Sequence, residues 1–338
     1  MKMEVAKNVL LSEHTTLKVG GVADYMVEVK DESELMEALR FAKQTAMPPL
    51  VLGGGSNILA SDEGCRGLVI KNRIKGVEYN VHGDNVYVSC GAGEMLDKVI
   101  EETVNKNYWG LENLSHIPGT VGATPVQNVG AYGVEVCSLI TEVSAINIET
   151  EQKNIFSNEE CKFSYRDSYF KTNEGKKWIV TKVVFKLSLL KSPKLSYGAL
   201  QDLEKNKSLT IQDIRNEVIR IRSTKFPDWN NIGTAGSFFK NPIIPNKQFA
   251  DLLIKYPDLP GYSVDSENTK IALGWVLDNV CSLKGYCENG VCLFKQQALV
   301  LINESAKDSA TIDDFANFVT EKVKEKIGVD IEREVTKI

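Results

Sequence analysis

Hydrophobic and polar residues follow a strand-then-helix pattern in the first third of the chain. Strands are expected at residues 25–29, 50–52 and 85–90, and helices at 33–42 and from 94 to about 105. In the first helix, apolar residues recur at helical spacing, and Asp31 precedes it as a plausible N-terminal cap. Two of the strands run directly into glycine-rich turns. This order of strand, glycine turn and helix predicts an α+β or α/β nucleotide-binding region.

The rest of the chain continues the mixed pattern. Further strands are expected at residues 143–149, 178–189 and 298–302, and further helices at 211–221, 247–256, 269–279 and 312–327. Pro227 follows the helix at 211–221 and marks the expected domain boundary. We therefore predict an α+β protein whose C-terminal part is a smaller α+β domain.

The composition is close to that of soluble globular proteins. The 338 residues are 43% hydrophobic and 25% charged, with a formal net charge of -5. An acidic chain has no basic field for nucleic acid or an anionic membrane. No apolar run is long enough for a spanning helix, and the N-terminus lacks the apolar core of a signal peptide. We expect a cytoplasmic protein of two or three compact units.

Seven cysteines are scattered along the chain without a Cys-x-x-Cys pair. They are Cys65, Cys90, Cys137, Cys161, Cys281, Cys287 and Cys292. Only three histidines accompany them, whereas zinc sites need closely spaced ligands. We therefore expect no metal site and no disulfide framework, but reduced and buried thiols.

Two glycine-rich segments are candidates for binding phosphate through backbone amides. One is Gly53-Gly54-Gly55-Ser56-Asn57, directly after a strand, and the other is the glycine- and proline-rich stretch 110–133. Neither is a Walker loop or a dinucleotide fingerprint. Alone, residues 53–57 fit a tight strand-to-loop connection equally well. Two such segments in one domain favour a long ligand with a central diphosphate, such as a flavin dinucleotide.

Two further segments carry charged groups suited to an anionic substrate. Arg166, in Tyr165-Arg166-Asp167-Ser168, offers a planar guanidinium to a carboxylate, although a solvated surface arginine is the commoner alternative. The charged run at 331–335 contains Glu334, and a surface edge strand is its alternative.

The segment 234–242 is more unusual. It places Ser237 between a glycine and two phenylalanines, with Lys240 and Asn241 close behind. An apolar surround desolvates the hydroxyl, and nearby positive charge lowers its pKa. The alternative interpretation is a turn with buried Phe anchors.

Taken in order, these segments closely resemble the UDP-N-acetylenolpyruvoylglucosamine reductase (MurB) family of bacterial cell-wall synthesis. The matching pieces cover essentially the whole chain and lie at 15–17, 53–57, 117–122, 127–133, 165–168, 235–242, 296–303 and 332–335. The resemblance implies the FAD-binding fold of the vanillyl-alcohol-oxidase/PCMH superfamily. It also implies a domain plan with two FAD-binding subdomains at 1–70 and 71–226, a substrate-binding domain at 227–327, and a tail at 328–338 that returns to the active site.

The resemblance further implies the activity of a UDP-N-acetylmuramate dehydrogenase, a flavin-dependent oxidoreductase. Such an enzyme uses FAD and NADPH to reduce the vinyl ether of UDP-N-acetylglucosamine enolpyruvate, giving the peptidoglycan precursor UDP-N-acetylmuramate. Ser237 matches the family's proton donor, and Arg166 and Glu334 match the residues at the substrate carboxylate. A monomer is expected.

Binding residues carry over in the same way. The expected substrate-binding residues are Tyr197, Asn241, Lys225, Arg222 and Gln296. Tyr197 lies in a segment, 195–200, that resembles the substrate loop of the family's longer, type I branch. The expected FAD contacts are Gly53, Gly54, Gly55, Ser56, Asn57, Pro118, Gly119, Thr120, Gly122, Ala123, Gln127, Asn128, Gly130, Ala131, Tyr132 and Gly133.

Two other functions remain open from the sequence. The first is a flavin oxidase of the same fold that uses oxygen, in which His116 is the one histidine suitably placed for covalent flavin attachment. The second is a flavin- or nucleotide-binding module without catalysis. The presence of Arg166, Ser237 and Glu334 together argues against a pure binder.

Overall fold

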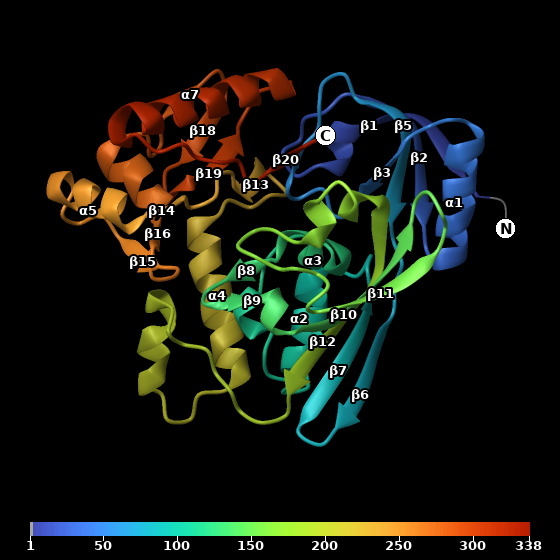
Figure 1. The fold of residues 1–338 in the computed structure, drawn as a ribbon, viewed down its shortest axis with the longest axis horizontal. Coiled ribbons are helices and arrows are strands. Elements are labelled where there is room, and N and C mark those ends of the chain that lie inside the picture. The colour runs from blue at the N-terminus through green and yellow to red at the C-terminus, as the bar shows by residue number, and fades with distance from the viewer. Residues whose placement is uncertain (1–2) are drawn as a thin grey trace. The chain divides into compact units, whose positions relative to one another are not determined.

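The computed structural model describes residues 3–338, which form two compact units (Figure 1). The first unit consists of the residues up to Val9, Ala23–Gly55 and Cys65–Arg222. The second consists of Leu10–Val22, Ser56–Gly64 and Ser223–Ile338. Each unit combines helices with sheets, which confirms the predicted α+β class.

A four-stranded sheet opens the first unit, in the order β1-β2-β5-β3 with β5 parallel to both of its neighbours. Its strands are β1 (Val5–Leu10), β2 (Val22–Val29), β3 (Pro49–Leu52) and β5 (Cys65–Asn72). Helix α1 (Glu32–Gln44) buries Leu35 and Leu39 in the same core as Leu68 of β5. Asp31 caps this helix as predicted, because its carboxylate accepts a hydrogen bond from Glu34 N at 2.8 Å.

The larger sheet of the first unit is antiparallel, in the order β11-β10-β12-β7-β6. Its strands are β6 (Val77–His82), β7 (Asn85–Gly91), β10 (Ile140–Asn147), β11 (Lys153–Ser157) and β12 (Trp178–Ser188). Helices α2 (Leu96–Asn105) and α4 (Ile211–Lys225) bury their apolar faces in this core. These elements confirm the strands and helices predicted in this region.

Short elements fill the glycine-rich part of this unit and its loops. They are α3 (Thr124–Gln127), β8 (Gly130–Ala131), β9 (Val134–Glu135) and the 3₁₀ helices Glu112–Leu114, Val121–Ala123, Val136–Ser138, Tyr169–Lys171, Gly175–Lys177 and Gly198–Lys205. The stretch 110–133 is thus an ordered backbone, as its composition predicted.

The second unit is built on a four-stranded antiparallel sheet, in the order β13-β19-β18-β17. Its strands are β13 (Gly233–Ser237), β17 (Cys287–Glu288), β18 (Val291–Phe294) and β19 (Gln297–Asn303). Helix α7 (Ser309–Ile327) packs its apolar side into the core of this unit. Leu17, Val19 and Leu59 are fully buried in the same core, although they come from the two N-terminal segments of the unit.

A small sheet in the order β14-β16-β15 completes the second unit, and here one prediction is wrong. The structure contains β14 (Ile243–Pro245), α5 (Asn246–Lys255), β15 (Gly261–Ser263), β16 (Asn268–Ile271), α6 (Leu273–Trp275) and a π-helical turn at Val276–Val280. The helix predicted over 269–279 therefore begins as a strand. Thr269 and Ile271 are buried on either side of Lys270, an alternation of period two that suits pairing with β14 and β15.

The C-terminal tail is anchored to an N-terminal segment of the same unit. Strand β20 (Thr336–Lys337) pairs in parallel with β4 (Ile58–Leu59), and Ser61 N donates to Ile338 O at 2.7 Å. The 3₁₀ helix Leu11–His14 lies in another N-terminal segment of this unit. Residues from both ends of the chain therefore build the second unit.

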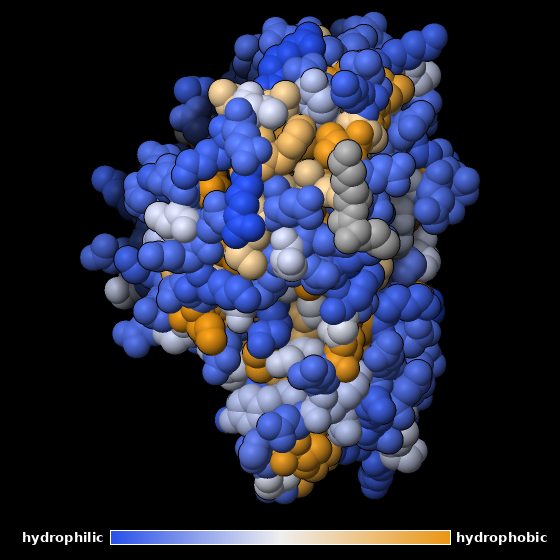
Figure 2. All heavy atoms as spheres, turned by 90° about the vertical axis from the view of Figure 1, so that its right-hand side faces the viewer, coloured by the Kyte–Doolittle hydropathy of each residue, from blue (hydrophilic) through white to orange (hydrophobic). Residues whose placement is uncertain are grey.

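Hydrophilic residues predominate on the face drawn in Figure 2, where apolar residues form small separate patches. Among residues 3–338, no helix combines the length and the apolar character needed to cross a lipid bilayer. Most large apolar side chains instead lie in the cores of the two units.

Candidate active site

The predicted proton donor, Ser237, lies at the end of β13 and is held there by the main chain. Ser237 pairs with Val300 of β19, and the next residue, Phe238, donates its N–H to Leu299 O at 3.0 Å. Phe238 and Phe239 are fully buried, whereas Ser237 keeps part of its surface exposed. The alternative of buried Phe anchors thus describes the packing correctly, and this packing still leaves the serine accessible.

The C-terminal tail brings Glu334 to the same segment. Glu334 N donates to Phe238 O at 2.8 Å. Two residues further on, Lys240 N donates to Glu332 O at 2.9 Å. Ser237 and Glu334 are remote in sequence, and these main-chain bonds bring the tail against the segment that follows Ser237 within one unit. The structure therefore brings together two of the three predicted catalytic residues.

Asn57, which was expected at the flavin, supports this tail. Its side-chain amide donates to Glu334 O at 3.2 Å, and its own carbonyl accepts from Thr336 N at 3.0 Å. Ser56 and Asn57 belong to the second unit, whereas the three glycines before them belong to the first. The predicted FAD-binding loop 53–57 is therefore divided between the two units.

Two polar residues follow Ser237 in the same segment. The Asn241 side-chain oxygen accepts a hydrogen bond from Leu273 N at 3.0 Å, which ties it to the start of α6. The Lys240 ammonium lies 2.9 Å from the Glu332 carboxylate. The positive charge expected beside the serine is therefore partly balanced by a carboxylate from the tail.

Arg166 lies in the first unit, against the glycine-rich stretch. Its guanidinium donates to Gly130 O at 2.8 Å and lies 5.4 Å from the centre of the Tyr165 ring. The residue is only partly exposed and has a positive φ of 55°. A non-glycine residue in this backbone region needs support from its surroundings. Arg166 is thus fixed beside β8, which argues against the alternative of a freely solvated arginine.

Arg222 and Tyr197 both contact the Tyr132 side chain in the first unit. The Arg222 guanidinium is buried, donates to His116 O at 2.9 Å and hydrogen-bonds the Tyr132 phenol. Burial lowers the pKa of Arg222, and the Tyr132 phenol and Asp97 oppose this effect. The rings of Tyr132 and Tyr197 meet edge to face, with their centres 5.3 Å apart. The buried Arg222 guanidinium thereby orients Tyr132, and Tyr197 of the expected substrate loop packs against the Tyr132 ring.

An ion pair that the sequence analysis missed holds the main chain at His116, which in turn accepts a hydrogen bond from Arg222. Arg215 donates to both oxygens of Asp97, at 2.7 and 3.2 Å, and His116 N donates to Asp97 at 2.6 Å. Burial raises the pKa of Asp97, but the hydrogen bonds from Arg215 and His116 N outweigh it, so the pKa lies below its usual value. Asp97 therefore holds His116, whose carbonyl holds Arg222.

The glycines of the first unit form a cradle that suits a dinucleotide. A Cβ on Gly53 would lie 2.6 Å from the Thr120 hydroxyl, and one on Gly54 would lie 2.9 Å from Gly119 Cα. Gly122 is equally close to its neighbour, because its Cβ would meet Ala92 Cβ at 2.6 Å. At Gly54 only glycine permits such close approach of two backbones, and backbone N–H groups of a glycine-rich loop are donors suited to a diphosphate. The predicted FAD residues in this unit thus fit the cofactor.

The remaining predicted FAD contacts of this unit lie around the 3₁₀ helix Val121–Ala123, α3 and β8: Pro118, Ala123, Gln127, Asn128, Gly130, Ala131, Tyr132 and Gly133. Asn128 is buried, and its amide donates to Glu135 at 3.2 Å and to Ser164 O at 2.9 Å. Both of its N–H groups therefore hold the glycine-rich stretch against the rest of the unit.

The other predicted substrate residues are more isolated. Lys225 is half-buried at the end of α4, and Gln296 is exposed between β18 and β19. In the described part of the chain, no hydrogen bond joins Gln296 to Ser237 or Asn241. The sequence analysis also missed a pair on the small sheet, where the exposed Tyr262 lies directly across from the half-buried Lys270. An aromatic ring beside an ammonium group suits a nucleotide ligand.

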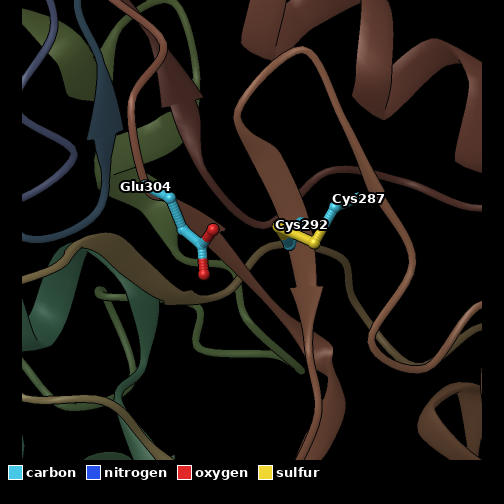
Figure 3. A group of neighbouring side chains, drawn as sticks. All are labelled: Cys287, Cys292 and Glu304. Atoms are coloured by element: carbon cyan, nitrogen blue, oxygen red, sulfur yellow. A yellow bond between two sulfur atoms is a disulfide. The ribbon is translucent and has the colours of Figure 1, made fainter.

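The prediction that all cysteines are reduced and buried is wrong. Cys287 and Cys292 form a disulfide, and Cys287 is exposed (Figure 3). The two face each other across β17 and β18, which are joined by Asn289 and Gly290, both with positive φ. A two-residue turn of this kind brings the flanking side chains together, a signal that the sequence analysis did not use. Of the five free cysteines, Cys65, Cys137 and Cys281 are only partly buried.

The disulfide has one acidic neighbour. Sulfur atoms of both cysteines and a carboxylate oxygen of Glu304 lie within 4.8 Å of one another (Figure 3). A metal ion requires thiolates, and sulfurs joined to each other are not thiolates. In the state that the structure describes, this group is therefore a disulfide rather than a metal site.

Comparisons with known proteins agree with the fold. Residues 23–151 match a family described as FAD binding domain, which agrees with the expected FAD cofactor. Residues 227–338 match the family described as UDP-N-acetylenolpyruvoylglucosamine reductase, C-terminal domain.

Whole-length relatives carry the same name. The UDP-N-acetylenolpyruvoylglucosamine reductase of Escherichia coli (strain K12) is 38% identical over 325 residues, which cover 96% of this chain and 94% of the relative. That of Bacteroides fragilis (strain YCH46) is 39% identical over 327 residues, covering 96% and 97%. The crystal structure of the Thermus caldophilus enzyme superposes with a TM-score of 0.69 at 26% identity, covering 100% and 99% of the two chains. The chain therefore belongs to the UDP-N-acetylenolpyruvoylglucosamine reductase (MurB) family.

Proposed function

We propose that this protein reduces UDP-N-acetylglucosamine enolpyruvate to UDP-N-acetylmuramate, with FAD as its cofactor and NADPH as the source of electrons. Membership of the reductase family along nearly the whole chain supports the reaction. The observation that carries the proposed chemistry is the pairing of the tail with the segment after Ser237. This pairing holds the residues that carry a hydroxyl and a carboxyl group on adjacent segments of one unit.

FAD supplies the hydride chemistry when it is bound, and the protein supplies proton transfer and charge stabilisation. Negative charge develops on the enolpyruvyl group during reduction, so its carboxylate needs fixed donors. In this proposal Arg166 provides a bidentate guanidinium and Glu334 provides a carboxyl group at that carboxylate. Ser237 Oγ gives its proton to the adjacent substrate carbon.

Binding of the sugar nucleotide is assigned to the remaining polar residues. In this proposal Tyr197 contacts the substrate, and Tyr132 and Arg222 support the Tyr197 ring. Arg222 is too buried to make an extensive contact with the substrate itself. Asn241, Lys225 and Gln296 complete the proposed set. The presence of Tyr197 in the segment 195–200 supports placing the protein in the type I branch of the family.

We also propose that the enzyme works as a cytoplasmic monomer. Each unit buries its own apolar side chains, and one chain carries every residue that the proposed chemistry needs. Size-exclusion chromatography with light scattering tests this part of the proposal, and a dimer at working concentrations would contradict it.

The central test separates the two halves of the reaction. Purified protein carrying FAD is mixed anaerobically with NADPH and then with the enolpyruvyl sugar nucleotide, while flavin absorbance is followed. We expect bleaching and then recovery of the yellow colour. Protein without flavin, or reduced flavin that the sugar nucleotide does not reoxidise, would exclude the proposed function.

Ser237→Ala tests the proton donor in the same assay. Flavin reduction by NADPH should keep its rate, whereas reoxidation by substrate should slow by about 10²- to 10⁴-fold, the usual contribution of a general acid. Ser266→Ala, at an exposed serine of the same unit, is the matched control and should change neither rate. Equal losses in both half-reactions would remove Ser237 from this role.

A further inference from the structure

A carboxylate on α7 makes side-chain contacts to the C-terminal tail. Arg333 and Lys337 both donate to the Asp313 side chain. The Arg333 guanidinium also donates to Asp313 O at 3.1 Å and to the Asn317 side chain at 2.8 Å. Asp313 is mostly buried, with a side-chain exposure of 14%. One acidic residue of the helix thus joins two basic residues of the tail.

Glu334 lies between these two basic residues in the sequence, next to Arg333. Arg333 forms an antiparallel bridge with Phe239, and its guanidinium lies 5.9 Å from the centre of the Phe238 ring. The Arg333 side chain therefore connects α7 to the segment that directly follows Ser237. Glu334 follows Arg333 directly and its N–H donates to Phe238 O, so fixing Arg333 against this segment also restrains the backbone of Glu334.

The charges around Asp313 favour its ionised form. Burial raises the pKa of this carboxyl, but the hydrogen bonds from Lys337 and Arg333 outweigh it and hold the pKa below its usual value. Asp313 therefore carries a negative charge near neutral pH, opposite the positive charges of Arg333 and Lys337. A neutral amide at position 313 keeps the shape but loses this attraction.

We propose that Asp313 is a positioning residue, which sets the register and orientation of Glu334 beside Ser237 by binding Arg333 and Lys337. It does not touch the substrate, and its effect on the reaction is exerted through Glu334. The inference rests on the proposed function, because it assigns Asp313 to the step in which Glu334 acts.

The test compares Asp313→Asn with Asp314→Asn in the FAD-loaded protein. Asp314 is the next residue of α7 and is exposed, and in the described residues its side chain makes no hydrogen bond or ion pair, so it matches the charge change without the tail contact. Asp313→Asn should slow reoxidation of reduced flavin by substrate about 10-fold or more, as expected for misplacement of a group near the reacting atoms. Flavin reduction by NADPH and the KM for the sugar nucleotide should change less than 2-fold. Asp314→Asn should resemble the wild type throughout.

A double-mutant cycle distinguishes positioning from a general loss of structure. In the Glu334→Gln background, Asp313→Asn should add less than 2-fold to the loss, because the group that it positions is already absent. Additive losses, or equal losses in both half-reactions, would overturn the inference. If Asp313→Asn does not fold, Lys337→Gln removes one of the two basic partners of Asp313 at an exposed position. This variant should slow reoxidation about 2- to 3-fold. An unchanged rate in that variant would also count against a positioning role for Asp313.

The wild-type protein separates this inference from the function on which it rests. If wild-type reduced flavin is not reoxidised by the substrate, the proposed function fails. If the wild type reacts and Asp313→Asn behaves like Asp314→Asn, only the role of Asp313 fails.

Discussion

Replacing Asp97 with alanine should both destabilise the first unit and loosen the support beneath Arg222. The Arg215 side chain is only 7% exposed, and Asp97 is 31% exposed. Removing one partner of a buried ion pair costs about 3–5 kcal/mol. Because water reaches Asp97, we expect a value at the lower end, about 3 kcal/mol. For a unit of this size, that corresponds to a fall of roughly 6–12 °C in the unfolding midpoint.

Glu101→Ala is the matched control. It removes an acidic residue of the same helix, α2, whose partner Lys98 is 72% exposed, so it should cost at most about 0.5 kcal/mol. Thermal unfolding of both variants, followed by circular dichroism, gives the comparison. An Asp97→Ala midpoint no lower than that of Glu101→Ala would refute the claim that this pair stabilises the loop at His116.

The pH dependence gives an independent check on Asp97. Its folded pKa lies below the usual value, because the hydrogen bonds from Arg215 and His116 N outweigh burial. Its stabilisation is therefore complete above the unfolded pKa of about 3.9 and is lost as the pH falls through the lower folded pKa. The difference between wild type and Asp97→Ala should be constant near neutral pH and should shrink in that acidic range.

Two further predictions concern the cradle and the cysteines. Gly54→Ala should lower the FAD content of the purified protein, because the new Cβ would lie 2.9 Å from Gly119 Cα; a normal flavin-to-protein absorbance ratio would contradict the close approach. Under denaturing conditions without reductant, five of the seven cysteines should react with a thiol reagent, and all seven should react after reduction. Cys287→Ser should give six in both cases, since it leaves Cys292 without a partner, and seven reactive thiols in the unreduced wild type would exclude the disulfide.

Local patterns predicted most of the secondary structure because each signal lies within a few residues. The cap at Asp31 and the apolar spacing of α1 are of this kind. The strand at 268–271 was missed because its identity depends on pairing with β14 and β15, which lie outside this segment. Propensity alone does not distinguish such a segment from the start of a helix.

The residues of the candidate site also divide into those that local motifs predict and those that depend on partners from other segments. Ser237 and Glu334 were singled out from motifs, and the structure supplied the hydrogen bond from Glu334 N to Phe238 O that relates them. Asp97 and Asp313 were not singled out, because a lone aspartate on a helix carries no motif. Their importance comes from partners that folding brings close, namely Arg215 and Arg333.

The composition of the second unit has a consequence for how this protein family is divided into parts. The family match for its C-terminal domain begins at residue 227, yet Leu17, Val19 and Leu59 are fully buried in the same core. A gene fragment that starts near that residue would encode a core with three apolar side chains missing. The C-terminal part is therefore a unit of architecture but not a transferable module, and recombination between homologues at that boundary would have to preserve two short N-terminal segments as well.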